Sequence, residues 1–265
     1  MKITKIDEYC FGEYQTVEKR ILTYNISSIR ISNLKPCNVI FSLYRFFEEQ
    51  DLSKAKQHFY VCGLLDAYSI QTYQDRMFDY DLHSIGYAML SDNLSFIKDD
   101  FAKLTYHSTY LEDVTEKVMP ISMEDNVLEG EGAIFTHTMQ QFLLGNTALI
   151  ERNLKIMEQV YFNAAHQNSS LQHDVKFFRA LYQKDVSKCE TILKEMVSPR
   201  VHQRRNIDAL LKKYISMPAL GYAKLAWILG IEVEIKSKLI PKELLPVQPL
   251  DNYEIPYDFL KDGNA

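Results

Sequence analysis

Apolar residues recur at helical spacing along most of the chain, and in three places the pattern repeats. In each place an apolar segment is followed by a short turn with Asn or Asp and then by a second apolar stripe. The segments are residues 87–104, 138–157 and 178–196, with Asn93, Asn146 and Asp185 aligned at the turns. Asn and Asp cap helix N-termini, and apolar residues three and four positions apart bury one helix face. The pattern predicts three antiparallel helical hairpins, the unit of helical-repeat proteins.

The three hairpins are unevenly spaced, because successive turns lie 53 and 39 residues apart. A strict tetratricopeptide array would keep one period. Two interpretations remain open: an irregular array of related hairpins, or ordinary antiparallel helix packing without repeat ancestry. Both predict an all-α architecture.

Before these hairpins, the helix boundaries are less regular. A first helix is expected at about residues 15–27, although residues 26–32 also fit a short strand. Residues 33–36 are expected to break the chain, because they end in a proline, which cannot continue helical hydrogen bonding.

The next segments give clearer signals. Residues 38–49 carry an apolar stripe and predict a helix. Another helix is expected to start at Asp51 and to extend to about Tyr73. Residues 105–131, in contrast, predict a long acidic connection with one helical turn, because they contain Pro120 and several acidic residues.

The C-terminal part predicts two helices and a tail. One helix is expected at residues 204–215 and another at 219–229, where Pro218 fits the first turn and Gly230 the stop. Residues 231–235 alternate like a short strand. The remaining prolines are Pro241, Pro246, Pro249 and Pro256. They predict an extended tail that packs across the surface through its apolar residues.

The predicted fold class is therefore all-α: an irregular, helical-repeat-like array of antiparallel helical hairpins with an extended, proline-containing C-terminal tail. We expect a single domain over residues 1–265, which can be subdivided into N-terminal helices (1–104), hairpins (133–230) and tail (231–265). The content of 46% apolar and 25% charged residues is ordinary for a globular protein. Only 9 glycines and 8 prolines are present, which is few for an all-β fold.

The cysteines indicate a reducing environment. Cys10, Cys37, Cys62 and Cys189 are widely spaced, form no C-x-x-C pair and have mostly apolar neighbours, which predicts buried free thiols. The N-terminal residues lack the apolar core of a signal peptide, and no run approaches the roughly 20 apolar residues that span a bilayer. We therefore expect a cytoplasmic protein without membrane contact.

Negative charge is concentrated in the first half of the chain. Residues 1–132 hold 13 basic and 21 acidic residues, whereas residues 133–265 hold 17 and 14. Residues 75–131 are the most acidic stretch, with 13 acidic and 4 basic residues. The net charge of −5 argues against nucleic-acid binding. Two interpretations of the acidic stretch remain open: a solvated face, or a surface that meets a basic partner.

No pattern in the sequence indicates catalysis with useful specificity. His173 and Asp174 match the core pair of HD phosphohydrolases, with His137 and Asp208 as further candidates for such a metal site. A helix N-terminal Asp beside an exposed His explains this pair better, because a two-residue motif arises easily by chance. His166 and His173 lack a third ligand at metal spacing, and zinc needs three or four. We expect no enzyme activity, cofactor or metal.

Three C-terminal segments carry a family resemblance. They are residues 219–235 (ALGYAKLAWILGIEVEI), 239–246 (LIPKELLP) and 249–253 (PLDNY). These segments resemble the bacterial family called immunity protein 49, most specifically over about residues 219–260, and the turn at residues 144–146 is compatible with it. The resemblance implies a helical cytosolic protein of a polymorphic-toxin system, which binds and neutralises a cognate toxin. It offers no catalytic residues to carry over.

With this resemblance, the acidic stretch becomes the candidate toxin-binding surface, since it would attract a basic toxin. The candidate residues are Asp92, Asp99, Asp100, Glu112, Asp113, Glu116, Glu124, Asp125, Glu129 and Glu131. Two alternative functions remain open. The first is a tetratricopeptide-like scaffold that binds a peptide in a helical groove, and the second is an HD-type metal-dependent hydrolase.

Overall fold

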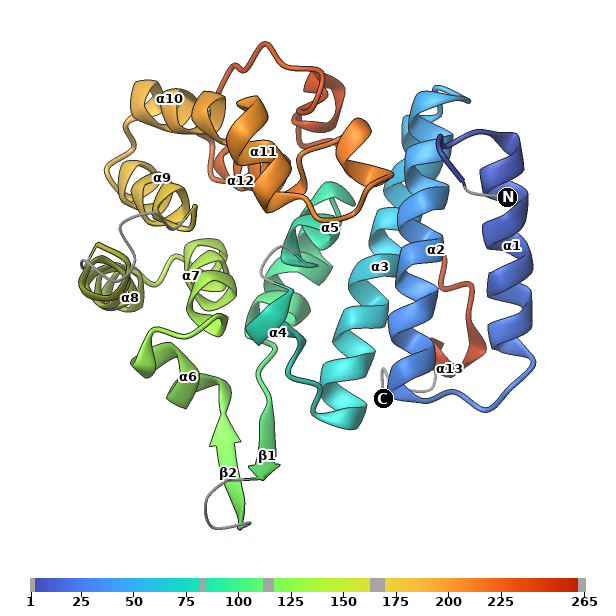
Figure 1. Cartoon of the computed structure of the whole chain (residues 1–265), viewed down its shortest axis with the longest axis horizontal. Helices are drawn as coiled ribbons and strands as arrows, with labels where there is room; N and C mark the ends of the chain where they lie inside the picture. The colour runs from blue at the N-terminus through green and yellow to red at the C-terminus, as the bar shows by residue number, and fades with distance from the viewer. Residues whose placement is uncertain (1–2, 82–83, 112–116, 163–169, 262–265) are drawn as a thin grey trace.

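Helices dominate the computed structural model, which describes residues 3–81, 84–111, 117–162 and 170–261. Figure 1 shows the N-terminal helices on one side, the later helical hairpins on the other, and a small two-stranded sheet that projects from the helical body. The predicted all-α array is confirmed, and the small sheet is an addition to it.

Three long helices form the N-terminal side. They are α1 (Glu8–Leu22), α2 (Ser28–Phe47) and α3 (Leu52–Tyr73). The carboxylate of Asp51 accepts a hydrogen bond from the Lys54 N–H at 2.9 Å and so caps α3. The predicted start and end of this helix are confirmed.

Two predictions for this side are wrong. α1 begins at Glu8 rather than near residue 15, because the Asp7 carboxylate caps it by accepting from the Cys10 N–H at 2.9 Å. The predicted strand at residues 26–32 and the predicted break at residues 33–36 do not form, because α2 begins at Ser28 and continues past Pro36. α2 packs against both α1 and α3, and this burial offsets the hydrogen bond lost at the proline.

The middle of the chain is the least regular part. It contains α4 (Met77–Tyr80), α5 (Ser84–Leu90), the π-turn η1 (Phe96–Asp100), the 3-10 turn η2 (Phe101–Lys103), β1 (His107–Leu111), β2 (Val118–Ser122) and α6 (Met123–Glu129). The predicted acidic connection over residues 105–131 is therefore wrong, because β1 and β2 pair antiparallel, from His107 opposite Ser122 to Leu111 opposite Val118. Pro120 fits there because each strand of a two-stranded sheet has a free edge.

Two of the three predicted hairpins are confirmed. The first pairs α7 (Ala133–Leu144) with α8 (Thr147–Tyr161), and the second pairs α9 (Gln172–Tyr182) with α10 (Val186–Met196). Asn146 caps α8 through the Leu149 N–H at 3.3 Å, and Asp185 caps α10 through the Lys188 N–H at 3.0 Å. The predicted hairpin at residues 87–104 is different: Asn93 accepts from the Phe96 N–H, but the segment that follows is the π-helix η1 and the 3-10 helix η2 rather than a regular α-helix.

The C-terminal side contains α11 (Pro199–Arg205), the 3-10 turn η4 (Leu211–Lys213), α12 (Met217–Ile228), the 3-10 turn η5 (Lys242–Leu244) and α13 (Asp258–Lys261). The predicted helix at 204–215 is wrong, because the Asn206 side chain binds the His202 carbonyl and the Met217 N–H and so separates α11 from α12. Pro218 in the first turn of α12 and the left-handed Gly230 (φ 75°) behind it are confirmed. Residues 231–235 form no strand.

The tail packs onto the helices, as predicted. Leu244, Leu245 and Tyr257 are buried in the same hydrophobic cluster as the helices. The ammonium of Lys224, at the centre of α12, donates to the carbonyl oxygens of Leu244, Leu245 and Pro246 at 3.0–3.1 Å. The four cysteines are free and buried, which confirms that prediction.

Candidate functional site

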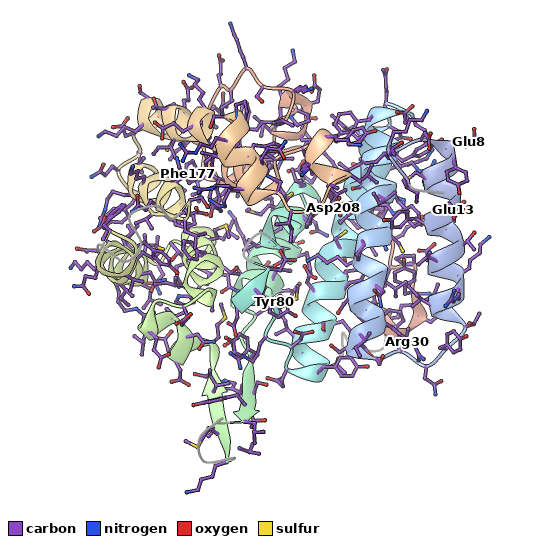
Figure 2. All side chains as sticks on the ribbon, in the orientation of Figure 1. Glu8, Glu13, Arg30, Tyr80, Phe177 and Asp208 are labelled. Atoms are coloured by element: carbon purple, nitrogen blue, oxygen red, sulfur yellow. The ribbon has the colours of Figure 1, made fainter. Side chains whose placement is uncertain are left out.

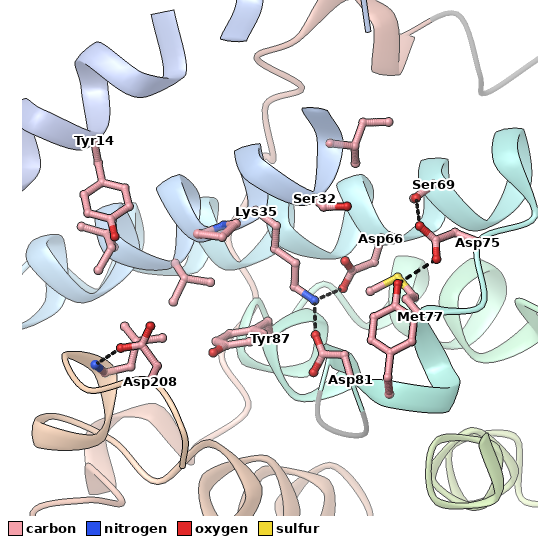
Figure 3. Close-up of a pocket in the computed structure, with 16 residues that line it drawn as sticks. Tyr14, Ser32, Lys35, Asp66, Ser69, Asp75, Met77, Asp81, Tyr87 and Asp208 are labelled. Carbon is pink, nitrogen blue, oxygen red and sulfur yellow. Dashed lines mark hydrogen bonds and ion pairs between the residues drawn. The ribbon is translucent and has the colours of Figure 1, made fainter. Parts of the chain in front are cut away.

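A groove lies between the N-terminal helices and the segment that joins α11 to α12 (Figure 3). It consists of two adjoining cavities, of about 300 and 340 Å³. Both cavities are lined by Tyr80, Asp81, Tyr87, Asp208 and Leu211. We call this groove the Tyr87 groove. The hairpins α7–α8 and α9–α10 contribute no lining residue, so the groove is not the repeat-lined surface of a tetratricopeptide-like scaffold.

Lys35 of α2 is the charged centre of the groove. Its ammonium nitrogen lies 2.9 Å from a carboxylate oxygen of Asp66 in α3 and 2.9 Å from one of Asp81. Burial lowers the pKa of Lys35, but the two carboxylates outweigh burial and hold the pKa above its usual value. Burial also raises the pKa of Asp66 to about 7. The ammonium is thus fixed in its charged form and shared between two acids.

Two tyrosines and a carboxylate face the groove beside this centre. Figure 3 shows Tyr14 of α1, Tyr87 of α5 and Asp208 around one end of the cavity. Tyr87 is only 8% exposed, and burial raises its pKa, so that its hydroxyl keeps its proton. Burial raises the pKa of Tyr14 as well. Asp208 uses one oxygen, Oδ1, to accept from the backbone N–H groups of Leu210 and Leu211 at 2.8 Å.

Short hydrogen-bonded links connect the groove to the projecting sheet. The Gln74 Oε1 accepts from the His107 N–H of β1 at 2.8 Å, and the Tyr106 hydroxyl donates to Asp79 of α4. Gly132 lies so close to the Asp79 carbonyl that a Cβ there would come within 1.9 Å of its oxygen. This approach fixes α4, and with it Tyr80 at the groove rim, against the start of α7.

Most of the predicted acidic residues lie on the surface. Those described as exposed are Asp99, Asp100, Glu124, Asp125, Glu129 and Glu131. Glu124 forms an ion pair with Arg152, and Asp125 closes the capping box of α6 with Ser122. Lys103 of η2 and Glu124 of α6 line one cavity, so these two elements adjoin at the surface. Glu112, Asp113 and Glu116 lie outside the described residues.

Asp92 is a correction to the predicted set. Its side chain is fully buried, and its two oxygens pair with Lys56 at 2.8 Å and Lys224 at 2.5 Å. The Gln248 N–H of the tail donates to the same carboxylate. A carboxylate closed in by two ammonium groups stabilises the core and cannot contact a partner.

The strands β1 and β2 expose apolar side chains. Leu111 is 60% and Val118 66% exposed, and Tyr110 and Met119 are exposed as well. Because Leu111 and Val118 are paired across the strands, they form one apolar patch. No pattern in the sequence indicates this patch, because the sequence of residues 105–131 predicts an irregular connection. We call β1, β2 and the six exposed acidic residues named above the acidic hairpin surface.

The HD pair does not form a metal site. Asp174 is buried, and its two oxygens lie 2.5 and 2.7 Å from the guanidinium of Arg205, while the Tyr222 hydroxyl donates to the same carboxylate. His137 instead contacts the side-chain amides of Gln141 and Asn153. His166 lies outside the described residues. Among the residues that are described, no group of three or more His, Cys, Asp and Glu could hold a metal ion.

The helices of the described segments include none with both the length and the apolar character needed to cross a membrane.

Sequence comparison gives one relationship. Residues 131–244, less than half of the chain, match the family described as Immunity protein 49. No curated protein and no solved structure matches the chain. The match covers the hairpins α7–α10 and the segments 219–235 and most of 239–246, whereas residues 249–253, which also suggested the family, lie beyond it. The resemblance is confirmed: over residues 131–244 this chain matches the immunity protein 49 family.

Proposed function

We propose that the protein is an immunity protein that neutralises a cognate toxin by direct binding and without catalysis. The observation that carries this proposal is the family match over residues 131–244. The acidic hairpin surface supports it, because exposed apolar side chains next to carboxylates are typical of a protein-binding surface. The acidic residues suit a toxin with a basic surface, which they would attract before contact.

The function is tested by co-expression with the toxin-domain product of the neighbouring gene. We expect growth to be rescued and a stable complex to be isolated from the same cells. The proposal fails if none of the neighbouring toxin candidates is neutralised.

The contact surface is tested by charge reversal. Asp99→Lys with Asp100→Lys, and Glu129→Lys with Glu131→Lys, should each weaken toxin binding by about tenfold or more, because like charges then face each other. The matched control is Glu8→Lys with Glu13→Lys. This pair changes the net charge equally but lies on α1, on the side of Figure 2 opposite the sheet. An equal loss of affinity in the control would assign the effect to net charge rather than to this surface.

A further inference from the structure

The Tyr87 groove is lined by a hydroxyl group that the fold leaves unused, on a side chain that is otherwise buried. Tyr87 is 8% exposed, and its hydroxyl makes no hydrogen bond to the residues that the structure describes. Its ring packs near Phe59, with centroids 6.2 Å apart, and the Lys35 ammonium lies 5.6 Å from the ring centroid. A hydroxyl that lines a cavity without a protein partner is available to hydrogen-bond a ligand that enters the cavity.

The charges in the first of the two cavities favour a cation. The lining of this cavity, of about 300 Å³, holds four carboxylates, Asp66, Asp75, Asp81 and Asp208, against the ammonium of Lys35. Asp66 and Asp75 are occupied, the first by Lys35 and the second by hydroxyls of Ser28, Ser69 and Tyr80. Asp208 uses only Oδ1 for backbone N–H groups, and within the described residues its Oδ2 has no partner.

The groove therefore presents two kinds of acceptor to a guest. The Oδ2 atom of Asp208 can accept a charge-assisted hydrogen bond, and the hydroxyl oxygens of Tyr14 and Tyr87 can accept weaker ones. The adjoining cavity is lined by Arg204, Arg205 and Lys212 against Asp81 and Asp208, so the charge changes sign between the two cavities and would orient a polar guest.

The rim of the groove favours a protein as the source of this cation. Ile207 is 93% exposed and Tyr80 is 69% exposed, and both line the groove. Figure 2 shows Tyr80 and Asp208 near the centre of the molecule, above the projecting sheet. Asp79, which precedes Tyr80, accepts from the Tyr106 hydroxyl, and Gln74 accepts from the His107 N–H, so the rim adjoins the start of β1. A small free amine would gain no binding energy from the exposed side chains of Ile207 and Tyr80 at the rim.

We propose that the Tyr87 groove binds a guanidinium or ammonium group on a side chain of the toxin, with Asp208 and Tyr87 as its recognition residues. This inference rests on the proposed function. The apolar rim residues Tyr80 and Ile207 contact the partner around this side chain. The groove thus adds a specific anchor to the long-range attraction of the acidic hairpin surface.

The first experiment uses a peptide in place of the toxin. The full chain is titrated with Gly-Arg-Gly and with Gly-citrulline-Gly, which keeps the shape but lacks the charge, and binding is followed by NMR. We expect saturable shifts at the groove with the arginine peptide and none with the citrulline peptide. Equal responses to the two peptides, or no response to either, would overturn the proposed cation recognition.

The second experiment measures toxin affinity of Tyr87→Phe and Asp208→Asn. The asparagine can still accept from Leu210 and Leu211, so the local turn is kept. Both variants should bind toxin about tenfold less tightly, because each removes a hydrogen bond to a charged group. Tyr60→Phe and Asp185→Asn are the controls: Tyr60 is equally buried, at 8%, without a hydrogen bond to its hydroxyl in the described structure, and Asp185 caps α10.

The outcomes separate this proposal from the proposed function. If the wild type neutralises toxin and the two groove variants bind as well as their controls, the groove proposal is wrong and the function stands. If the arginine peptide binds but the toxin does not depend on the groove, the cation comes from another source and the proposal is again wrong. If the wild type binds no toxin, the function fails, and the peptide titration alone decides on cation recognition.

Discussion

The buried ion pair between Asp174 and Arg205 should be among the residues to which stability is most sensitive. Arg205→Ala would leave a buried carboxylate with only the Tyr222 hydroxyl, so we expect the free energy of unfolding to fall by about 3–5 kcal/mol. Arg179 pairs with Glu158 at 2.7 Å in a partly exposed position. Arg179→Ala should therefore cost about 1 kcal/mol or less. Urea denaturation of both variants measures the difference, and equal losses would contradict it.

Two histidines should make the fold sensitive to mild acid. Burial lowers the pKa of His58 and of His137 to about 4 each. In the unfolded chain they take up a proton near pH 6.5, so between pH 6.5 and 4 the unfolded state binds more protons. Stability from each histidine is therefore present above pH 6.5 and is lost as the pH falls toward 4, by at most about 3 kcal/mol.

This pH effect has an opposing contribution from Asp66, whose raised pKa makes stability fall as the pH rises from about 4 to 7. The histidine contribution is isolated by comparing unfolding free energies of the wild type and of His58→Gln and His137→Gln at pH 7 and pH 4.5. Each variant should lose less stability than the wild type over this interval. A parallel loss in all three proteins would show that the histidines are not responsible.

The groove shows why single residues of a site are hard to predict from sequence. Tyr14, Lys35, Asp66, Tyr87 and Asp208 come from five separate segments, and none belongs to a local motif. Their significance arises only when α1, α2, α3, α5 and the turn after α11 meet. Asp92 was misjudged for the same reason, because its two ammonium partners are distant in sequence and turn an apparent surface acid into a core residue.

At the scale of elements, predictions succeeded where the signal was local. Asp51, Asn146 and Asp185 each bind an N–H three residues ahead, so short-range chemistry alone determines where those helices begin. Predictions failed where packing competes with local preference. Pro36 is tolerated inside α2 because α2 packs against α1 and α3. Asn206 ends α11 because its side chain hydrogen-bonds both His202 in α11 and Met217 in α12.

The C-terminal tail gives a prediction at this scale. Lys224→Met removes the donor to three tail carbonyl groups and one of the two cations beside Asp92. We expect the tail beyond residue 245 to become sensitive to proteases and the free energy of unfolding to fall by about 3 kcal/mol or more. Lys155→Met, at an exposed position of α8, is the control. An uncleaved tail in the Lys224 variant would show that apolar packing alone holds it.

For the binding of a partner by the whole molecule, the distribution of charge matters more than the net charge. The first 132 residues carry the excess of acids, and the last 133 residues carry a slight excess of bases. In the proposed interface, the exposed acids of the acidic hairpin surface would attract the partner, and the apolar side chains of β1 and β2 would then contact it. Electrostatic attraction between exposed charges extends over about a Debye length, roughly 8 Å at physiological salt. Apolar contacts, in contrast, stabilise the complex only after the two proteins have docked.

These two contributions should separate in the kinetics of toxin binding. Asp99→Lys with Asp100→Lys should slow association and flatten its decrease with added salt, because guidance by charge is lost. Leu111→Ser with Val118→Ser should leave association and its salt dependence unchanged but speed dissociation about tenfold, because apolar contacts are lost only in the bound state.

Both pairs are exposed, so unfolding free energies should stay within about 0.5 kcal/mol of the wild type. Stopped-flow or surface-based kinetics at several salt concentrations measure both rates. If the serine variant dissociated at the wild-type rate, the sheet would lie outside the interface, and the acids would guide the toxin toward a different contact.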